Sequence, residues 1–122
     1  MHNVGVDIIE IRRVESALAR YGERFLMRVY TDAEIRFCRG RLPDLAARFA
    51  GKEAISKALG TGLKGISWRE MEILPDQRGK PLVTLRGQAL KRAGELGLKD
   101  FAITLSHTHE HAVAFVVAAD HL

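Results

Sequence analysis

The chain has 122 residues, of which 47% are apolar and 28% charged, with one cysteine and a formal net charge of +4. This composition excludes an intrinsically disordered chain and an internal disulfide framework, because one thiol has no partner within the chain. No apolar run approaches the roughly 20 residues of a membrane span, so we expect one complete, soluble, cytoplasmic domain over residues 1–122, with no membrane partner.

The N-terminal half of the sequence predicts one strand and three helices. Residues 4–9 are rich in β-branched side chains, which favours a strand. Residues 10–21 show helical spacing of apolar positions before a glycine stop. The sequence TDAE at residues 31–34 matches a capping box and predicts the start of a second helix. A proline at the start of residues 43–59 and a glycine after them indicate a third, longer helix.

The C-terminal half predicts four strands and one helix. Residues 71–73 and 82–85 favour strands, and the glycine-containing turn between them indicates a hairpin. Residues 88–96 predict a short helix, and residues 101–105 and 112–119 predict two further strands joined by a polar turn. Because strands and helices do not alternate regularly, we expect an α+β fold rather than a doubly wound parallel sheet.

Asp7 lies inside the first predicted strand, where its neighbours are apolar. Aspartate is depleted in strands, and a buried carboxylate costs free energy unless a partner compensates its charge. Two interpretations stay open at this point. Asp7 is either a metal ligand or acid/base group, or a carboxylate held by a backbone amide or an arginine.

The predicted helix over residues 43–59 has one face of small alanines and one polar face. The polar face gathers one carboxylate, one hydroxyl and several cations: Arg48, Lys52, Glu53, Ser56 and Lys57. Glu53 and Lys57 fit a solvated ion pair one helical turn apart. Together with Asp7, Glu53 also fits a pair of carboxylates that hold Mg²⁺ while the cations bind phosphate.

Two further patterns are weaker. Residues 60–65 (GTGLKG) match G-x-G-x-x-G, but the motif follows a helix and precedes a strand, the reverse of a dinucleotide site. What remains is a glycine-rich loop whose backbone can approach a ligand. Residues 106–111 place three histidines at alternate positions, yet a polar turn interrupts them and no cysteine or second histidine cluster supplies further ligands. We therefore do not expect zinc there.

Three segments of the sequence resemble the holo-acyl-carrier-protein synthases, the short, single-domain 4'-phosphopantetheinyl transferases. They are residues 5–13 (GVDIIEIRR), 48–62 (RFAGKEAISKALGTG) and 105–108 (LSHT), of which the second is the most specific. The resemblance covers essentially the whole chain, including a Gly79-Lys80-Pro81 turn. It implies an α+β fold in which an antiparallel sheet packs with helices.

This resemblance implies a reaction, its cofactor and its residues. A serine hydroxyl of an acyl carrier protein attacks the β-phosphate of coenzyme A, 3′,5′-ADP leaves, and the holo-carrier serves fatty acid biosynthesis. Asp7 and Glu53 match the family's Mg²⁺ ligands, and with Lys57 they form the implied catalytic set. Glu53, directly or through a water, is the candidate acceptor for the serine proton. The residues that match the coenzyme A site are Arg48, Lys52, Ser56, Lys57, Gly60, Gly62, Lys80, Pro81, Ser106 and His107.

The resemblance also implies protein partners. The family's first helix contacts an acidic carrier protein, and the matching residues here are Arg13, Arg20 and Arg24. Longer relatives carry two copies of this unit with the active site between them. A chain with one copy therefore implies a homotrimer with its sites between subunits, in which a neighbour supplies His107 and the Gly79-Lys80-Pro81 turn.

Two other functions remain as alternatives. Residues 12–57 hold eleven Lys or Arg and six Asp or Glu, a basic excess that would suit nucleic acid. The aromatic residues are not interleaved with these arginines as stacking platforms, and no RNP, KH or zinc-finger signature is present, so we expect no nucleic-acid partner. A metal-dependent phosphohydrolase would need only the two carboxylates.

Overall fold

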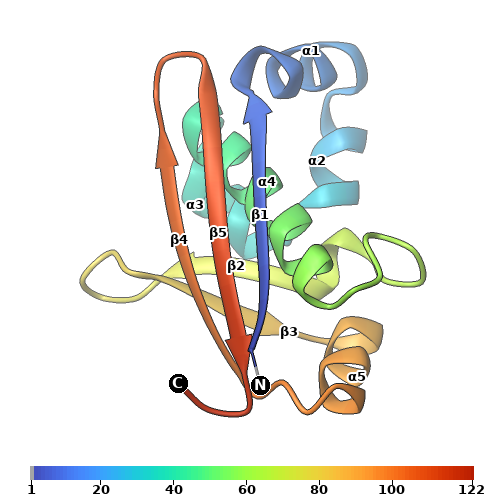
Figure 1. Cartoon of the computed structure of the whole chain (residues 1–122). Coiled ribbons are helices and arrows are strands. Elements are labelled where there is room, and N and C mark those ends of the chain that lie inside the picture. The colour runs from blue at the N-terminus through green and yellow to red at the C-terminus, as the bar shows by residue number, and fades with distance from the viewer. Residues whose placement is uncertain (1) are drawn as a thin grey trace.

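The computed structural model describes residues 2–122 and contains five strands and five α-helices (Figure 1). The helices are α1 (Ile11–Tyr21), α2 (Glu23–Val29), α3 (Asp32–Cys38), α4 (Leu42–Ala58) and α5 (Gly87–Glu95). The strands are β1 (His2–Glu10), β2 (Met71–Pro75), β3 (Pro81–Leu85), β4 (Asp100–His107) and β5 (His111–Ala119), and a short 3₁₀ helix, η1 (Trp68–Glu70), precedes β2. No helix within residues 2–122 combines the length and the apolar character needed to cross a bilayer.

The strands form two antiparallel sheets. β5 lies between β1 and β4 in a three-stranded sheet, and β2 pairs with β3 as a separate hairpin. In the view of Figure 1 the hairpin runs across the three longer strands, and the helices lie beside and behind them. The expected α+β fold, with antiparallel strands packed against helices, is confirmed.

Helix α4 packs closely on the inner face of the three-stranded sheet because its contacting side chains are small. Ala54 and Ala58 are buried in this layer. Gly5 of β1 lies directly against the α4 backbone, where a Cβ atom would overlap the carbonyl oxygen of Ala54. Since successive strand residues alternate between faces, Gly5 and Asp7 both point toward α4. The missing side chain of Gly5 thus sets how near Asp7 comes to that helix.

The outer face of the three-stranded sheet is apolar and no element of residues 2–122 covers it. Its most exposed large side chains are 43–64% accessible and come from β1 and β5: Val4, Val6, Ile8 and Phe115. The strand register places Val6 directly opposite Phe115. A contiguous apolar patch of this kind is typical of a protein–protein interface.

Two elements, α2 and η1, are present that the sequence did not predict. Helix α2 has only seven residues and follows Gly22 without a side-chain cap, so neither a periodic pattern nor a start signal marks it. Tertiary packing holds α2 instead: Phe25 meets the ring of Tyr30 edge-on and stacks on Phe49. By contrast, the capping box that predicted α3 is formed in full at Thr31.

Candidate active site

The structure brings together Asp7 of β1 and two residues of α4, Glu53 and Lys57. Lys57 Nζ lies 3.1 Å from Asp7 Oδ1 and donates a hydrogen bond of 2.9 Å to the carbonyl oxygen of Val6. Glu53 is one helical turn before Lys57, on the side of α4 that faces β1. Asp7 and Glu53 both line a cavity of about 440 Å³, which we call the carboxylate cavity.

The surroundings of Glu53 oppose its negative charge. Burial raises the pKa of the Glu53 carboxyl group, the charge of Asp7 raises it further, and Lys57 acts in the opposite direction. Two carboxylates on one cavity repel each other and attract a cation. Mg²⁺ prefers one or two protein carboxylates, with water and phosphate oxygens completing its shell. Asp7 and Glu53 therefore fit Mg²⁺, and within residues 2–122 no three His, Cys, Asp or Glu side chains gather as a fuller ligand set.

A second group of expected site residues lies around another cavity, of about 460 Å³, which we call the Arg48 cavity. Its walls come from α4, the β2–β3 turn and β4, and include Arg48, Gly79, Pro81, Ser106 and His107. Arg48 is held in place because its Nε donates a 2.9 Å hydrogen bond to Ile73 O and its guanidinium lies 4.6 Å from the centre of the Phe37 ring. The two cavities share no lining residue among residues 2–122. The expected metal ligands thus lie at one cavity, and several residues of the expected coenzyme A site lie at the other.

Lys52 and Ser56 of α4 are fully buried and face neither cavity. Lys52 Nζ donates to Glu34 Oε1 at 2.7 Å and to the carbonyl oxygens of Met71 and Trp68 at 2.7 and 3.1 Å. An ammonium has three donors, so none is left for a phosphate. This contradicts the expectation that Lys52 binds coenzyme A directly. The Ser56 hydroxyl is likewise not presented to a ligand, because it donates to Glu53 O within the same helix at 2.7 Å.

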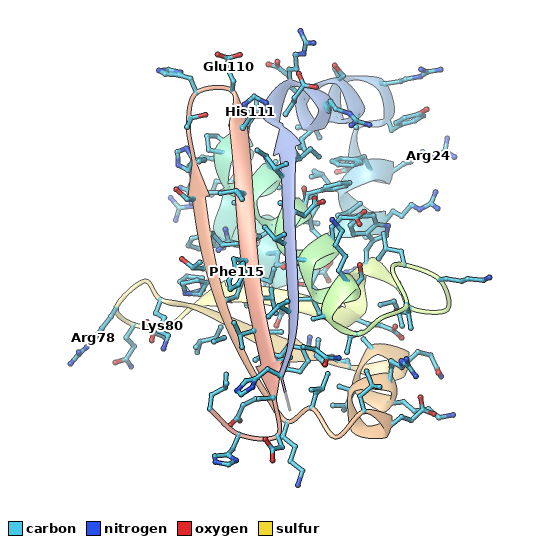
Figure 2. All side chains as sticks on the ribbon, in the orientation of Figure 1. Arg24, Arg78, Lys80, Glu110, His111 and Phe115 are labelled. Carbon is cyan, nitrogen blue, oxygen red and sulfur yellow. The ribbon has the colours of Figure 1, made fainter. Side chains whose placement is uncertain are left out.

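The remaining expected coenzyme A residues lie in surface loops. Gly60 and Gly62 follow α4 and have φ angles of 76° and 58°, a conformation that favours glycine. Lys80 is exposed on the β2–β3 hairpin, which extends away from the three-stranded sheet (Figure 2). Their contacts with a substrate stay predictions.

The arginines that the resemblance assigns to the carrier protein are exposed on α1 and α2; they are Arg13, Arg20 and Arg24. Arg13 also lines the carboxylate cavity, and Arg24 lines the neighbouring cavity together with Arg28. Phe25 and Phe49 line both cavities and so join them. The sequence did not single out Arg28 or these two rings, because apolar aromatic residues are typical of a core.

In sequence, the chain is similar to enzymes that share one name. The profile described as the 4'-phosphopantetheinyl transferase superfamily matches residues 3–116. The holo-[acyl-carrier-protein] synthase of Herpetosiphon aurantiacus is 51% identical over 120 residues, which cover 93% of this chain and 94% of the relative. The protein of the same name from Dehalococcoides mccartyi is 53% identical over 116 residues, which cover 95% of this chain and 97% of the relative.

Solved structures that are similar to this fold carry the same name as these relatives. The Helicobacter pylori holo-[acyl-carrier-protein] synthase, crystallised in complex with coenzyme A, matches with a TM-score of 0.87 at 32% identity and covers 95% of this chain and 99% of its own. The Bacillus anthracis holo-(acyl-carrier-protein) synthase in complex with CoA (3',5'-ADP) matches with a TM-score of 0.77 at 36% identity, covering 95% and 94%. The likeness therefore extends over nearly the whole of each chain.

Proposed function

This chain belongs to the holo-[acyl-carrier-protein] synthases of the 4'-phosphopantetheinyl transferase superfamily, and from that membership we infer its reaction. It transfers the 4'-phosphopantetheine arm of coenzyme A to a serine of apo-acyl carrier protein and releases 3′,5′-ADP. We propose that the holo-carrier serves fatty acid biosynthesis. We also propose the cytoplasm as the compartment, because the free, buried Cys38 suits a reducing environment.

The cluster of Asp7, Glu53 and Lys57 supports this reaction at the level of chemistry. The serine oxygen bonds to the β-phosphorus of coenzyme A while the bond from that phosphorus to the leaving 3′,5′-ADP oxygen breaks. Such a transfer asks the protein mainly to position groups and to neutralise charge. Lys57, whose ammonium lies beside Asp7 and is half exposed, is placed to meet the negative pyrophosphate.

Asp7 and Glu53 are the residues that we propose hold Mg²⁺. Bound there, the ion would neutralise negative charge on the pyrophosphate as the bond breaks. We propose Glu53 as the acceptor of the serine proton, directly or through a water. In the metal-free protein, burial and the charge of Asp7 raise the pKa of this carboxyl group, whereas a bound cation would favour its ionised form.

We further propose that a second copy of this chain completes each active site. The carboxylate cavity and the Arg48 cavity have separate walls, although the first holds the residues that match the metal ligands and the second holds residues that match the coenzyme A site. The outer face of the three-stranded sheet exposes Val6, Ile8 and Phe115, and another copy packed there would remove this apolar surface from water. Following the family resemblance, the assembly that we propose is a homotrimer with three shared sites.

Mass spectrometry of the carrier protein tests the reaction directly. After incubation with coenzyme A and Mg²⁺, apo-acyl carrier protein gains the mass of one phosphopantetheine arm. Asp7→Asn and Glu53→Gln abolish this gain, and circular dichroism shows that both variants keep the fold. If several carriers gain no mass, the proposal is overturned, and phosphate released from coenzyme A without any carrier indicates a phosphohydrolase instead.

A further inference from the structure

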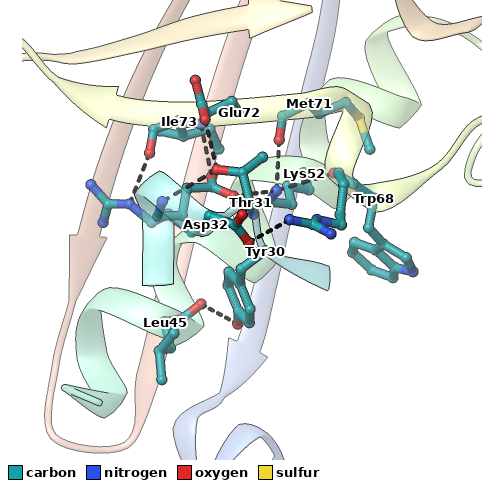
Figure 3. A network of polar contacts seen from close by, with 12 residues as sticks. Tyr30, Thr31, Asp32, Leu45, Lys52, Trp68, Met71, Glu72 and Ile73 are labelled. Atoms are coloured by element: carbon teal, nitrogen blue, oxygen red, sulfur yellow. Dashed lines mark hydrogen bonds and ion pairs between the residues drawn. The ribbon is translucent and has the colours of Figure 1, made fainter. Parts of the chain in front are cut away.

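A buried ion pair between Glu34 and Lys52 lies one residue along α4 from Glu53, the proposed metal ligand. Both side chains are fully inaccessible to solvent, and Lys52 is the residue before Glu53 in α4. Figure 3 shows the polar network around this pair, which joins α3, α4 and β2. Glu34 Oε1 also accepts from the Thr31 backbone at 2.9 Å, as part of the α3 cap. Glu34 is thus held by the cap of α3 as well as by Lys52.

The same network takes up backbone groups of β2. Glu34 Oε2 accepts a 2.8 Å hydrogen bond from Ile73 N, and Arg48 Nε donates to Ile73 O at 2.9 Å. Lys52 donates to Met71 O at 2.7 Å. Charged side chains of α3 and α4 therefore make hydrogen bonds to backbone groups of β2 that a neighbouring strand would otherwise satisfy. These bonds hold β2 in one position along α4.

This position matters because each element leads to a different half of the proposed site. Helix α4 presents Glu53 to the carboxylate cavity and places Lys57 beside Asp7, which lines the same cavity. Strand β2 leads into the turn with Gly79 and Pro81, which lines the Arg48 cavity. A shift of β2 along α4 would therefore change where one half of the site lies relative to the other.

We propose that Lys52 is a positioning residue, neutralised by Glu34, which fixes the β2–β3 hairpin against the α4 turn that holds Glu53. The inference rests on the proposed function. It differs from a direct contact with coenzyme A, because a phosphate would have to break three existing hydrogen bonds to reach the ammonium. Glu34 is the carboxylate in direct contact with the ammonium, at 2.7 Å, and both side chains are inaccessible to solvent, so loss of either partner leaves a buried charge unpaired.

The test is a cycle of Lys52→Met, Glu34→Gln and the double variant. Each single change leaves an unpaired charge or unsatisfied polar group in the interior, whereas the double change removes both charges together. We expect each single variant to lower the kcat/KM for coenzyme A at least tenfold. We expect the double variant to return to within about threefold of the wild type, because the glutamine of Glu34→Gln can still accept from Ile73 N and Arg48 still donates to Ile73 O. Strand β2 then stays anchored, and no buried charge is left unpaired. A direct phosphate ligand would give no such rescue, so a double variant as impaired as Lys52→Met overturns the proposal.

A second readout separates positioning from mere stability. Binding of Mn²⁺, followed by electron paramagnetic resonance well below the melting temperature, reports the carboxylate pair without needing turnover. We expect Lys52→Met to weaken Mn²⁺ binding severalfold and the double variant to restore it. Unchanged Mn²⁺ affinity and an unchanged KM for coenzyme A in a folded but less stable Lys52→Met variant overturn the proposal. Because this measurement needs no carrier protein, it stands even if the proposed transfer fails.

The control is an exposed ion pair that joins the same part of the fold. Asp32 of α3 and Arg69 of η1 lie 2.8 Å apart, and their side chains are 67% and 37% exposed. We expect Asp32→Asn to leave kcat/KM and Mn²⁺ affinity within twofold of the wild type, because solvent compensates an exposed partner. If a single variant of the buried pair fails to fold, the double variant decides. Wild-type-like Mn²⁺ affinity in it supports the proposal, and weak Mn²⁺ binding by the folded double variant overturns it.

Discussion

At Glu53, burial and the charge of Asp7 raise the pKa of the carboxyl group above its ordinary value, and Lys57 only partly offsets them. A carboxyl group whose pKa is raised by folding contributes stability below its unfolded pKa and loses that contribution as the pH rises through its folded pKa. At neutral pH, ionised Glu53 therefore destabilises the metal-free protein. Glu53, which we propose as a metal ligand, therefore carries a negative charge that the metal-free fold disfavours.

We therefore expect Glu53→Gln to raise the melting temperature of the metal-free protein at pH 7.5 by about 1–3 °C. The gain shrinks as the pH falls and vanishes well below about 4, where the wild-type carboxyl group is protonated in both states. Thermal denaturation across this pH range, in buffer with a chelator, measures the difference. A Glu53→Gln variant that is less stable at pH 7.5 contradicts the assigned electrostatics.

Arg24 allows a test of carrier recognition that leaves the carboxylate cavity intact. It is exposed on α2, apart from the residues that line that cavity. We expect Arg24→Glu to raise the KM for acyl carrier protein about tenfold, because it replaces attraction to an acidic partner by repulsion. The KM for coenzyme A stays within twofold. Lys91→Glu on α5, which changes the net charge equally, should alter neither value, and steady-state kinetics with each substrate varied in turn measure both.

Individual residues also show where sequence reasoning reaches its limit. Asp7 stands out in the sequence because a carboxylate within an apolar strand needs an explanation. Lys52 does not stand out, since its spacing fits a solvated helix face as well as a ligand. Its partner Glu34 lies 18 residues away on another helix, and only the packing of α3 and β2 against α4 turns that face into interior. Burial of this kind depends on tertiary contacts that local spacing does not contain.

Among the elements, the contact between β1 and α4 is the one that places the site. Gly5→Ala puts a methyl group onto the Ala54 carbonyl, so β1 must move away from α4. We expect a loss of about 1–3 kcal/mol in the free energy of unfolding, together with weaker turnover because Asp7 moves with the strand. Denaturant titration and the carrier assay measure the two effects.

The matched control for Gly5 is Gly94, a helical glycine of α5 where an added Cβ would meet nothing within 4 Å. Gly94→Ala should stabilise the protein by about 0.5–1 kcal/mol, because alanine loses less conformational freedom in a helix. Equal effects of the two substitutions would show that the close approach of β1 to α4 has no special role.

At the level of elements, most of the fold could be predicted because local signals mark it. The capping box at Thr31, the proline near the start of α4 and the short apolar run of β5 each identify an element. Helix α2 could not be predicted, since seven residues give too short a pattern and aromatic packing against Phe49 holds it in place. Which residues line the carboxylate cavity and which line the Arg48 cavity could not be predicted either, because the lining depends on how the elements are arranged in space.

For the whole molecule, the outer sheet face offers a direct test of assembly. Phe115 is 43% exposed on β5, and Leu90 is 55% exposed on α5. We expect Phe115→Glu to give a monomer and to lower turnover at least tenfold, since a charge on the proposed interface disfavours its burial. Leu90→Glu should keep the wild-type assembly. Light scattering measures the mass of the assembly. A wild-type chain that is monomeric and fully active would overturn the shared-site proposal.

Mixing two inactive variants tests whether the active sites are shared. Asp7→Ala removes part of the carboxylate cavity, and His107→Ala removes part of the Arg48 cavity. If each site joins these cavities from neighbouring subunits, random mixed trimers restore about one quarter of the sites. Co-refolding the variants in equal amounts, followed by the carrier assay, measures the recovery. Activity no higher than that of the separate variants would mean that each chain forms its own site.

Strand β1 presents Asp7 to the proposed metal site and, on its opposite face, exposes Val6 and Ile8. Under the proposed function, adjacent positions of this short segment therefore serve two different ends, catalysis and assembly. Because side chains alternate, an insertion or deletion of one residue upstream of Asp7 that slips the strand's pairing would exchange the two faces. A carboxylate would then enter the apolar surface, and a valine or isoleucine would face the Glu53 turn. A substitution in β1 affects one position, whereas a change in the length of β1 would move every side chain after it to the other face of the sheet.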